Sequence, residues 1–432
     1  MIQPTRHHVI LGAGPAGLIA AETLRQHAPL DTITLVGDEA EPPYSRMAIP
    51  YLLIGNIDER GTHLRKNAAH LADLKVNHVQ ARAKHVDIAT KTIAMEDREP
   101  LQFDRLLIAT GSRPVRPPIP GIASAGVYPC WTLEDARRIM ALAQPGARVL
   151  QMGAGFIGCI IMEALASRGV ELTVVEMGDR MVPRMMGPTA GGMIKNWCEA
   201  KGVTVFTSTK VEEITPGQPM RVRLSNGDTL LADLVISATG VEPAIGFLDG
   251  SGIACEHGVL TNAQLETNVP GIFAAGDCAQ AFDRMTGRTV VSAIQPNAAE
   301  QARVAAFNML GRGINLKGVP QINVLDTLGM ISTSFGAWQG VAKAQGGDHV
   351  ELTDLAAGKH LSLQFAGDVL VGCNSVGWTA HVGVMRGLVE GKIKLGEWAD
   401  HLKADPTQLM AAYIATAQAQ NAWSGALDER RR

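Results

Sequence analysis

The sequence predicts an α/β protein with two repeated parallel-sheet units and a smaller α+β region at its C-terminal end. Three observations favour this fold class. The length of 432 residues suits two to four domains. The composition of 46 glycines, 46% hydrophobic and only 4% aromatic residues is typical of α/β chains, whose loops bring backbone close to a ligand. Two glycine-rich loops, 141 residues apart (153 minus 12), each join a strand-like to a helix-like segment.

The first glycine loop follows an apolar, strand-like segment at residues 8–11 and leads into a helix-like segment. Its sequence, GAGPAG at residues 12–17, is a G-x-G-x-x-G pattern in the setting that dinucleotide binding requires. Gly12 would form the tight turn, Gly14 would let a pyrophosphate approach the backbone, and Gly17 would permit close helix packing. The helix N-terminus would then face the phosphates. For a single copy, a turn without a ligand is the alternative.

The second glycine loop, GAGFIG at residues 153–158, repeats this arrangement after the strand-like residues 148–150. Each unit then ends in an apolar strand followed by Ala-Thr-Gly and, two residues later, a proline. These segments are LLIATGSRP at residues 106–114 and LVISATGVEP at residues 234–243, and the two Ala-Thr-Gly turns lie 129 residues apart (238 minus 109). The repeats predict two copies of one nucleotide-binding architecture.

Acidic residues follow three of the apolar strands, where a ribose or a sugar-like chain would lie. In the second unit the acid is Glu176, 23 residues after Gly153. In the first unit Asp38 and Glu39 follow the strand, and for Glu39 a solvated loop end is the alternative. Asp277 ends the strand-like segment GIFAAGD and would point into the ligand crevice, unless it only caps the next helix.

Charge and cysteine content exclude other classes. Lys and Arg total 39 against 42 for Asp and Glu, so a net charge of −3 provides no basic field for nucleic acid or an anionic membrane. The six cysteines are scattered without a C-x-x-C pair, which favours reduced cytosolic thiols over a metal site or a disulfide framework. No apolar run of about 18 residues occurs. We expect a soluble, cytoplasmic protein without a metal or membrane insertion.

Together these motifs resemble the pyridine-nucleotide flavoprotein oxidoreductases. The similarity is greatest to the branch with rubredoxin and ferredoxin reductases, the flavoprotein part of NADH-dependent nitrite reductases and apoptosis-inducing-factor-like proteins. It spans residues 8 to about 305 and rests on GAGPAG, PYSRMAIPYLL, ATGSRP, GAGFIG, ATGVEP, GIFAAGDCA and QPNAAEQAR. The resemblance implies a glutathione-reductase-type fold of two Rossmann-like domains, with an FAD domain at 1–120 and 247–315, an NAD(H) domain at 121–246 and a C-terminal interface domain at 316–432.

The resemblance also implies the cofactor-binding residues. Asp277 would bind the ribityl chain of FAD, and Asn297 and Ala298 would open a helix under the isoalloxazine ring. Gln295 stands where relatives often carry tryptophan. The full implied set for the first unit is Gly12, Gly14, Ala16, Gly17, Asp38, Glu39, Arg46, Ala109, Thr110, Gly111, Arg113, Gly276, Asp277, Gln295, Pro296, Asn297 and Ala298. For the second unit it is Gly153, Gly155, Phe156, Ile157, Gly158, Glu176 and Gly240.

Two departures from the family pattern bear on the chemistry. Met47 occupies the position of the single redox cysteine in coenzyme A disulfide reductases and NADH peroxidases, and a thioether cannot become a thiolate. Ile160 stands where relatives usually carry glutamate near the nicotinamide, and Glu163, one helical turn further, is no obvious replacement. We expect Met47 and Ile160 near the reaction site and no catalytic side chain, because the flavin mediates the reaction.

The leading hypothesis is an FAD-dependent NAD(P)H oxidoreductase that passes hydride from NADH to FAD and then electrons to a separate carrier such as rubredoxin or ferredoxin. An NADH oxidase or diaphorase that uses oxygen or a quinone is one alternative. An FAD-bound assembly or signalling protein is another. Glu176 should favour NADH over NADPH, although Arg180 could weaken that preference. The expected partners are NADH and a redox carrier protein, and a homodimer is left open.

Overall fold

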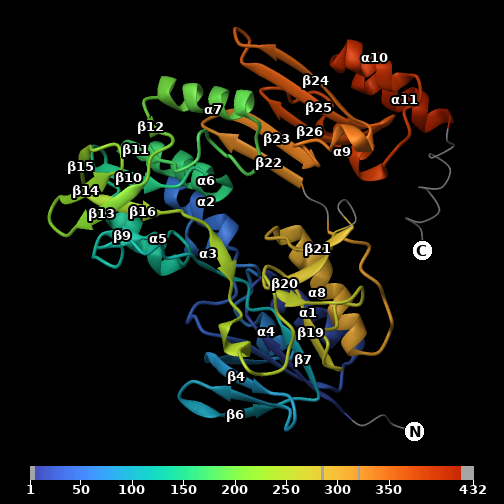
Figure 1. Ribbon diagram of the computed structural model, residues 1–432. Coiled ribbons are helices and arrows are strands. Elements are labelled where there is room, and N and C mark those ends of the chain that lie inside the picture. The colour runs from blue at the N-terminus through green and yellow to red at the C-terminus, as the bar shows by residue number, and fades with distance from the viewer. Residues whose placement is uncertain (1–4, 284–286, 320–321, 420–432) are drawn as a thin grey trace. The chain divides into compact units, whose positions relative to one another are not determined.

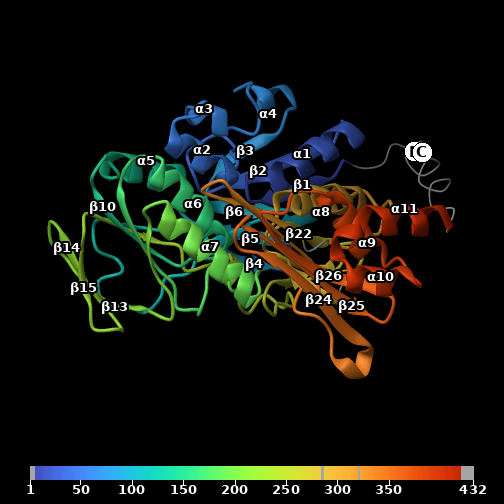
Figure 2. The same ribbon diagram turned by 90° about the horizontal axis from the view of Figure 1, so that it is seen from above.

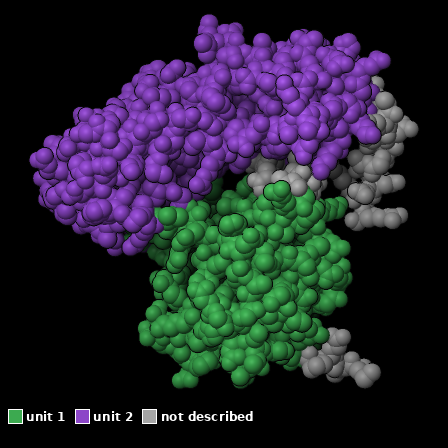
Figure 3. Space-filling model, viewed as in Figure 1, with its two compact units in different colours: residues 1–115, 131–136, 241–320 green, residues 116–130, 137–240, 321–432 purple. Residues whose placement is uncertain are grey.

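The computed structural model describes residues 5–283, 287–319 and 322–419, and it divides the chain into two compact units (Figure 3). The first unit consists of Met1–Val115, Trp131–Ala136 and Val241–Pro320. The second unit consists of Arg116–Cys130, Arg137–Gly240 and Gln321–Arg432. Each unit therefore collects segments that are far apart in the sequence.

The first unit is built on a five-stranded parallel sheet in the order β19-β7-β1-β2-β3. Its strands are β1 (His7–Leu11), β2 (Thr32–Gly37), β3 (Asn77–Gln80), β7 (Arg105–Ile108) and β19 (Ile272–Ala274). Helices α1 (Pro15–His27) and α8 (Gln295–Met309) pack together on one face (Figure 1). Strands β1, β2, β7 and β19 are largely apolar and buried, as parallel strands covered on both faces usually are, whereas strand β3 is polar and largely exposed.

Smaller elements complete the first unit. A three-stranded antiparallel sheet supplies Val86 and Ile93 to the apolar core on the face opposite α1. A short antiparallel pair, β8 with β17, lies where the chain leaves this unit and returns to it. The remaining elements are η1 (Arg46–Ala48), α2 (Ile49–Ile54), α3 (Glu59–Thr62), α4 (His70–Asp73), β4 (Ala83–Asp87), β5 (Thr92–Met95), β6 (Arg98–Gln102), β8 (Ser112–Pro114), β17 (Val241–Pro243), η2 (Gly246–Leu248), β18 (Val259–Leu260), β20 (Ala279–Asp283) and β21 (Arg288–Val291).

The second unit repeats the parallel sheet in the order β12-β11-β10-β16-β9. The strands are β9 (Val127–Tyr128), β10 (Arg148–Met152), β11 (Glu171–Val175), β12 (Thr204–Phe206) and β16 (Leu234–Ser237). The helices are α5 (Leu133–Leu142), which begins in the first unit, α6 (Phe156–Ala166) and α7 (Pro188–Ala200). An antiparallel sheet covers part of the core with β13 (Val211–Thr215), β14 (Met220–Leu224) and β15 (Thr229–Ala232).

The C-terminal part of the second unit is a five-stranded antiparallel sheet in the order β22-β23-β26-β25-β24. Helices α9, α10 and α11 pack beside it (Figures 1 and 2). The Trp197 indole of α7 donates to the Leu328 carbonyl at 3.0 Å, which ties the sheet to the rest of its unit. The elements are β22 (Ile322–Thr327), β23 (Met330–Gly336), η3 (Lys343–Gln345), β24 (Gly347–Asp354), β25 (Lys359–Ala366), β26 (Val369–Val376), α9 (Val382–Gly391), α10 (Trp398–Ala404), η4 (Pro406–Gln408) and α11 (Leu409–Ala419).

The predicted fold class is confirmed, because two parallel sheets with flanking helices precede an α+β region. The predicted domain boundaries stay a prediction, and residues 420–432 of the expected C-terminal domain lie outside the described residues. One helix boundary was predicted wrongly. Helix α8 begins at Gln295 and not at Asn297, because Pro296 is compatible with a first helical turn. No helix among the described residues is long and apolar enough to cross a membrane.

Candidate functional site

The first glycine loop joins β1 to α1, and its three glycines have distinct roles. Gly12 has a φ of +112°, and a Cβ there would lie 2.0 Å from the Ala109 carbonyl oxygen. A Cβ at Gly17 would lie 1.8 Å from the Gly12 carbonyl oxygen. Gly14 has an ordinary φ of −79°, and a Cβ there would meet no atom within 4 Å. The outer glycines are therefore required by the backbone, whereas Gly14 borders open space at the start of α1.

The second glycine loop has the same geometry between β10 and α6. A Cβ at Gly153, whose φ is +94°, would lie 2.4 Å from the Ala238 carbonyl oxygen, and one at Gly158 would lie 2.5 Å from the Gly153 carbonyl oxygen. A Cβ at Gly155, which has a φ of −74°, would again meet no atom within 4 Å. Both loops therefore leave room for a pyrophosphate at a helix N-terminus, where backbone amides and the helix dipole favour anions. This geometry fits FAD in one loop and NAD(H) in the other.

The Ala-Thr-Gly turns lie beside these loops. The Ala109 amide donates to the Leu11 carbonyl at 2.7 Å, and the Ala238 amide donates to the Met152 carbonyl at 2.8 Å, so each turn continues the sheet next to its glycine loop. Thr110 donates its hydroxyl to the Ala244 carbonyl at 2.9 Å. Gly111 and Gly240 both have positive φ, and a Cβ at either would meet no atom within 4 Å. These turns line the same open ends of the parallel strands as the glycine loops.

Glu39 and Arg46 form a side-chain cluster in the first unit. Arg46 donates to Glu39 at 2.6 Å and to the Trp131 carbonyl at 2.7 Å, and the Tyr44 hydroxyl donates to Glu39 at 2.6 Å. The guanidinium carbon lies 5.4 Å and 5.2 Å from the ring centroids of Tyr44 and Trp131, within cation–π range. Burial raises the pKa of Tyr44, which keeps its hydroxyl protonated as a donor. Trp131 could not be predicted from the sequence, because it lies 85 residues from Arg46 and no motif marks it.

Asp38 and Arg113, two of the predicted FAD residues, lie in exposed ion pairs. Arg82 donates to the Asp38 carboxylate at 2.9 Å, and Arg113 donates to Glu242 at 2.9 Å across the β8–β17 pair. The predicted contacts of Asp38 and Arg113 with FAD stay predictions. In either case the side chain would have to bind the cofactor in addition to its ion-pair partner.

Gly276 lies between α1 and α8, and Asp277 follows it in the chain. Gly276 has a φ of +83°, and a Cβ there would lie 3.3 Å from the Cβ of Ala16 and 3.6 Å from that of Ala298. The Gly276 amide donates to Gln301 at 2.7 Å, and the Ser112 hydroxyl donates to Asp277 at 2.9 Å. Burial raises the pKa of Asp277. The structure thus brings together the predicted residues Gly276, Ala16 and Ala298. It adds Gln301, a buried polar residue inside α8 that no sequence motif marks.

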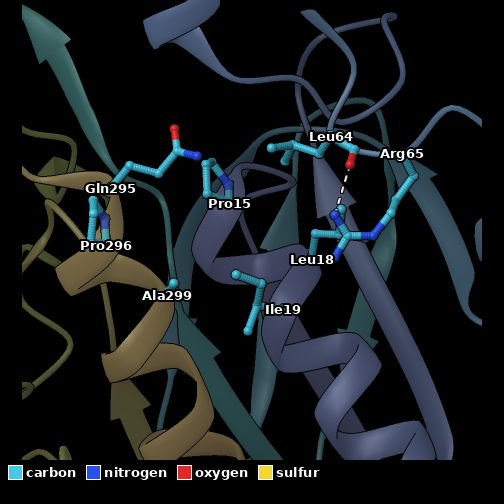
Figure 4. A pocket seen from close by; sticks show the side chains of 8 residues that line it. All are labelled: Pro15, Leu18, Ile19, Leu64, Arg65, Gln295, Pro296 and Ala299. Carbon is cyan, nitrogen blue, oxygen red and sulfur yellow. Dashed lines mark hydrogen bonds between the residues drawn. The ribbon is translucent and has the colours of Figure 1, made fainter.

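The starts of α1 and α8 line a pocket of about 200 Å³ in the first unit. Figure 4 shows the Gln295 amide beside Pro15, while the Arg65 guanidinium donates to the Leu64 carbonyl at 2.7 Å. Gln295 also accepts from the Ser45 hydroxyl at 2.6 Å, and Asn297 donates to the Ser292 hydroxyl at 2.8 Å. The lining residues are Pro15, Leu18, Ile19, Leu64, Arg65, Gln295, Pro296 and Ala299. This volume is smaller than most ligand sites, so the pocket is too small to hold a whole dinucleotide.

In the second unit, Glu176 is held by backbone amides. The Ala154 amide donates to one carboxylate oxygen and the Gly178 amide to the other, both at 2.7 Å. Arg180 is engaged elsewhere, because it donates to the Met186 carbonyl at 2.8 Å and to Asp179 at 2.7 Å. The predicted weakening of NADH preference by Arg180 therefore lacks support, since a free guanidinium would be needed to meet a 2′-phosphate.

The two residues expected near the reaction lie on different units. Met47 lies in η1 of the first unit with 48% of its surface exposed, and Tyr51, one turn further, is 57% exposed. Ile160 lies in α6 of the second unit and is partly exposed. Phe156 and Ile157 form the first residues of the same helix. Ile160 is thus close enough to solvent that a polar substitute there would stay hydrated.

All six cysteines are among the described residues, and none forms a disulfide with another. Burial raises the pKa of the Cys278 thiol to about 11 and the pKa values of Cys198 and Cys373 to about 12. Burial also raises the pKa of Cys159, which is fully enclosed. These thiols are therefore protonated at neutral pH and poor nucleophiles. Within the described residues, no group of three or more His, Cys, Asp or Glu side chains could hold a metal ion.

Comparisons with known proteins agree with this geometry. The family model for pyridine nucleotide-disulphide oxidoreductase matches residues 6–305. The chain is 30% identical over 403 residues to the NADH-dependent phenylglyoxylate dehydrogenase subunit epsilon of Aromatoleum evansii, covering 92% of this chain and 95% of that protein. It is 31% identical over 312 residues to the ferredoxin–NAD(+) reductase component of the biphenyl dioxygenase system of Paraburkholderia xenovorans, covering 72% and 76%. A solved ferredoxin reductase from Rhodopseudomonas palustris matches with a TM-score of 0.80 and 25% identity, covering 89% and 95%.

Proposed function

The chain belongs to the pyridine nucleotide-disulphide oxidoreductase family, and from this premise we propose that it carries electrons from NADH through FAD to a separate redox protein of the ferredoxin or rubredoxin type. Family membership confirms the predicted resemblance, the class of FAD-dependent NAD(P)H oxidoreductase, and FAD and NAD(H) as cofactors. The observation that carries the proposal is the pair of matching loops, each with a middle glycine that borders open space. When bound, FAD supplies the conversion between two-electron and one-electron transfer.

In this proposal the first unit holds FAD. The start of α1 and the open side of Gly14 take the pyrophosphate. The cluster of Arg46 and Glu39 supplies one cation and one acid, and the partly exposed Asp277 supplies a carboxyl group for the ribityl hydroxyls. The start of α8 points backbone amides at the ring, where they favour negative charge.

The second unit holds NAD(H) at Gly155 and the start of α6. Both carboxylate oxygens of Glu176 already accept one backbone amide each, and each oxygen keeps lone-pair capacity for a ribose hydroxyl. A carboxylate fixed in this way accepts two neighbouring hydroxyls well and repels a 2′-phosphate. This arrangement supports NADH as the preferred donor.

The proposal requires no nucleophilic side chain. Four cysteines are buried with raised thiol pKa values, and Met47 has no ionisable proton. The side chains bind and orient the two cofactors and exclude water, and proximity supplies the rate. Alkylation of the folded protein should modify the exposed Cys255 and leave NADH-dependent flavin reduction within about 2-fold of its starting rate. Loss of turnover with FAD still bound would restore a thiol mechanism.

Anaerobic stopped-flow spectroscopy tests the function itself. The purified protein is mixed with NADH, and the reduced flavin is then offered oxygen, a quinone, a ferredoxin or a rubredoxin. We expect reduction by NADH and fastest reoxidation by one of the carrier proteins. Oxygen or quinone as the fastest acceptor would favour an oxidase or diaphorase. FAD that NADH does not reduce would favour an assembly or signalling role.

The proposal places the reductase in the cytoplasm, where the thiols of this chain stay reduced. The absence of disulfides among its described cysteines is compatible with that location. The homodimer stays a prediction, which light scattering of the purified protein tests directly.

A further inference from the structure

Gln151 is a buried polar residue directly beneath the second glycine loop. It lies in β10, two residues before Gly153, with no exposed surface. Its side-chain nitrogen donates to the Gly153 carbonyl and to the Gly158 carbonyl, both at 2.9 Å. Its side-chain oxygen is buried without a hydrogen-bond partner among the described residues. An unpartnered buried oxygen costs free energy, so packing alone does not explain this residue.

In the first unit, the position equivalent to Gln151 carries an apolar side chain. Ile10 lies two residues before Gly12, in β1, and is also fully buried. The two loops differ in the distance between their first and last glycines. A Cβ at Gly17 would lie 1.8 Å from the Gly12 carbonyl oxygen, whereas a Cβ at Gly158 would lie 2.5 Å from the Gly153 carbonyl oxygen. The same Cβ at Gly158 would lie 3.1 Å from the Gln151 nitrogen. The Gln151 amide therefore reaches into the second loop, which is the wider of the two.

One peptide group connects Gln151 to the acid that would bind ribose. The carbonyl of the Gly153–Ala154 peptide accepts from Gln151, and the amide of the same peptide donates to Glu176 at 2.7 Å. Because a peptide group is planar, fixing its oxygen also fixes the direction of its N–H bond. Gln151 thus sets the direction of one of the two backbone amides that hold the Glu176 carboxylate.

We propose that Gln151 is a positioning residue for NAD(H). It holds the Gly153–Ala154 peptide so that Glu176 is presented to the ribose hydroxyls, and it holds the Gly158 carbonyl at the first turn of α6. Gln151 lies below the loop and acts only through these backbone groups. This inference rests on the proposed assignment of the second loop to NAD(H). It adds that Gln151, a buried residue beneath that loop, contributes to the preference for NADH over NADPH.

Gln151→Met tests this role, because methionine has nearly the same shape and no N–H donor. Calorimetric binding of NADH and NADPH analogues that cannot transfer hydride is measured on the FAD-loaded protein, together with FAD content and thermal stability. We expect unchanged FAD content, an NADH-analogue Kd raised about 10-fold (about 1.4 kcal/mol), and an NADPH-analogue Kd raised less than about 3-fold. The preference for the NADH form should fall because Glu176 loses its fixed direction. Hydrogen exchange of peptides containing Ala154 should become faster.

A merely structural role predicts a different pattern. In that case Gln151→Met would change thermal stability and leave the ratio of the two Kd values unchanged, which would overturn the proposal. Gln151→Ile, the residue type found at position 10, provides a second variant should methionine fold poorly, and the matched change Ile10→Met should leave both Kd values unchanged. A wild-type protein that bound neither nucleotide would refute the proposed function together with this inference. Equal affinities in wild type and Gln151→Met would refute this inference alone.

Discussion

The two glycine loops share one backbone plan and differ in what supports them. Both place a positive-φ glycine against an Ala-Thr-Gly turn and leave the middle glycine open. Beneath the first loop lies the apolar Ile10, and beneath the second lies the amide of Gln151. The acid of the first unit, Glu39, is held by side chains, whereas Glu176 is held by backbone amides. The two copies thus share the same steric contacts and differ in their hydrogen-bonding partners.

This difference matches two ways of holding a dinucleotide. A carboxylate held by the backbone is already oriented, which lowers the ordering cost each time a ligand binds. Glu39 shares its charge with Arg46, Tyr44 and, through Arg46, Trp131, so a ligand there must join an existing cluster. The backbone-held Glu176 of the second unit suits a cofactor that is exchanged at every turnover. The Glu39 cluster of the first unit suits a cofactor that stays bound.

Matched substitutions in the two glycine loops should give the greatest change in cofactor binding. Gly14→Val should abolish FAD retention and Gly155→Val should abolish NADH binding with FAD retained, because either side chain would occupy the place of a pyrophosphate. Both positions have ordinary φ values and no atom within 4 Å of an added Cβ, so the fold should survive. Flavin absorbance and NADH titration should show losses of at least about 100-fold, or roughly 2.7 kcal/mol. The opposite pattern would reverse the assignment of the loops.

The next effect concerns the acids. Wild type should prefer NADH over NADPH by about 10- to 100-fold in kcat/KM, or roughly 1.4 to 2.7 kcal/mol, because Glu176 repels a 2′-phosphate. Arg180 is already occupied by the Met186 carbonyl and Asp179 and should not offset this. Glu176→Gln should bring the ratio toward unity. The matched change Glu39→Gln, in the first unit, should leave the ratio unchanged, and an equal effect of both variants would contradict the comparison.

A smaller gain is expected from Ile160→Glu, which introduces in α6 the glutamate that the resemblance predicts near the nicotinamide. Its partly exposed position should keep the new carboxylate hydrated, so a charge-assisted hydrogen bond to the carboxamide could form at about 1.5 to 3 kcal/mol before losses. Flavin reduction at limiting NADH should then be about 10-fold faster in anaerobic stopped flow. The uncharged variant Ile160→Gln should gain less. An unchanged rate and affinity would place position 160 away from the nicotinamide.

The smallest expected effect is a difference in acid sensitivity between the units. Burial lowers the pKa of His7, His8 and His78 in the first unit, and for His8 burial outweighs the hydrogen bond with Asp31. A lowered folded pKa means that the unfolded chain binds more protons, so stability is full above pH 6.5 and declines as pH falls below it.

In the second unit, burial lowers the pKa of His360 alone among the described histidines whose shift is resolved. The thermal midpoint should therefore fall by roughly 2 to 4 °C between pH 7.5 and pH 5.5. His8→Leu should reduce that fall more than the matched change His360→Leu. If neither variant altered the fall in thermal midpoint between pH 7.5 and pH 5.5, the acid sensitivity would come from other groups.

Much of the fold and the two loops could be predicted because their signals are local. A Cβ at Gly17 or Gly158 would meet the carbonyl of the first glycine of its own loop, and Gly12 and Gly153 have positive φ, so the spacing of the glycines marks each loop. The strand ends at Glu176 and Asp277 could be located for the same reason, since an apolar run followed by an acid is visible in sequence. The start of α8 was misplaced by two residues, because a proline that opens a helix also resembles a helix stop.

The repeated architecture, the positions of both glycine loops and the acids that follow the strands can all be read from the order of residues. The contacts that those acids make follow from the packing of the folded chain. It paired Asp38 with Arg82 and joined Arg46 to Trp131. It also placed the side chain of Gln301 against the Gly276 amide and that of Gln151 against the Gly153 carbonyl. These two kinds of feature differ in the sequence separation of the residues that interact. Steric limits on a turn act between neighbours in the chain, whereas hydrogen-bond partners of a buried side chain are chosen by which distant segments pack beside it.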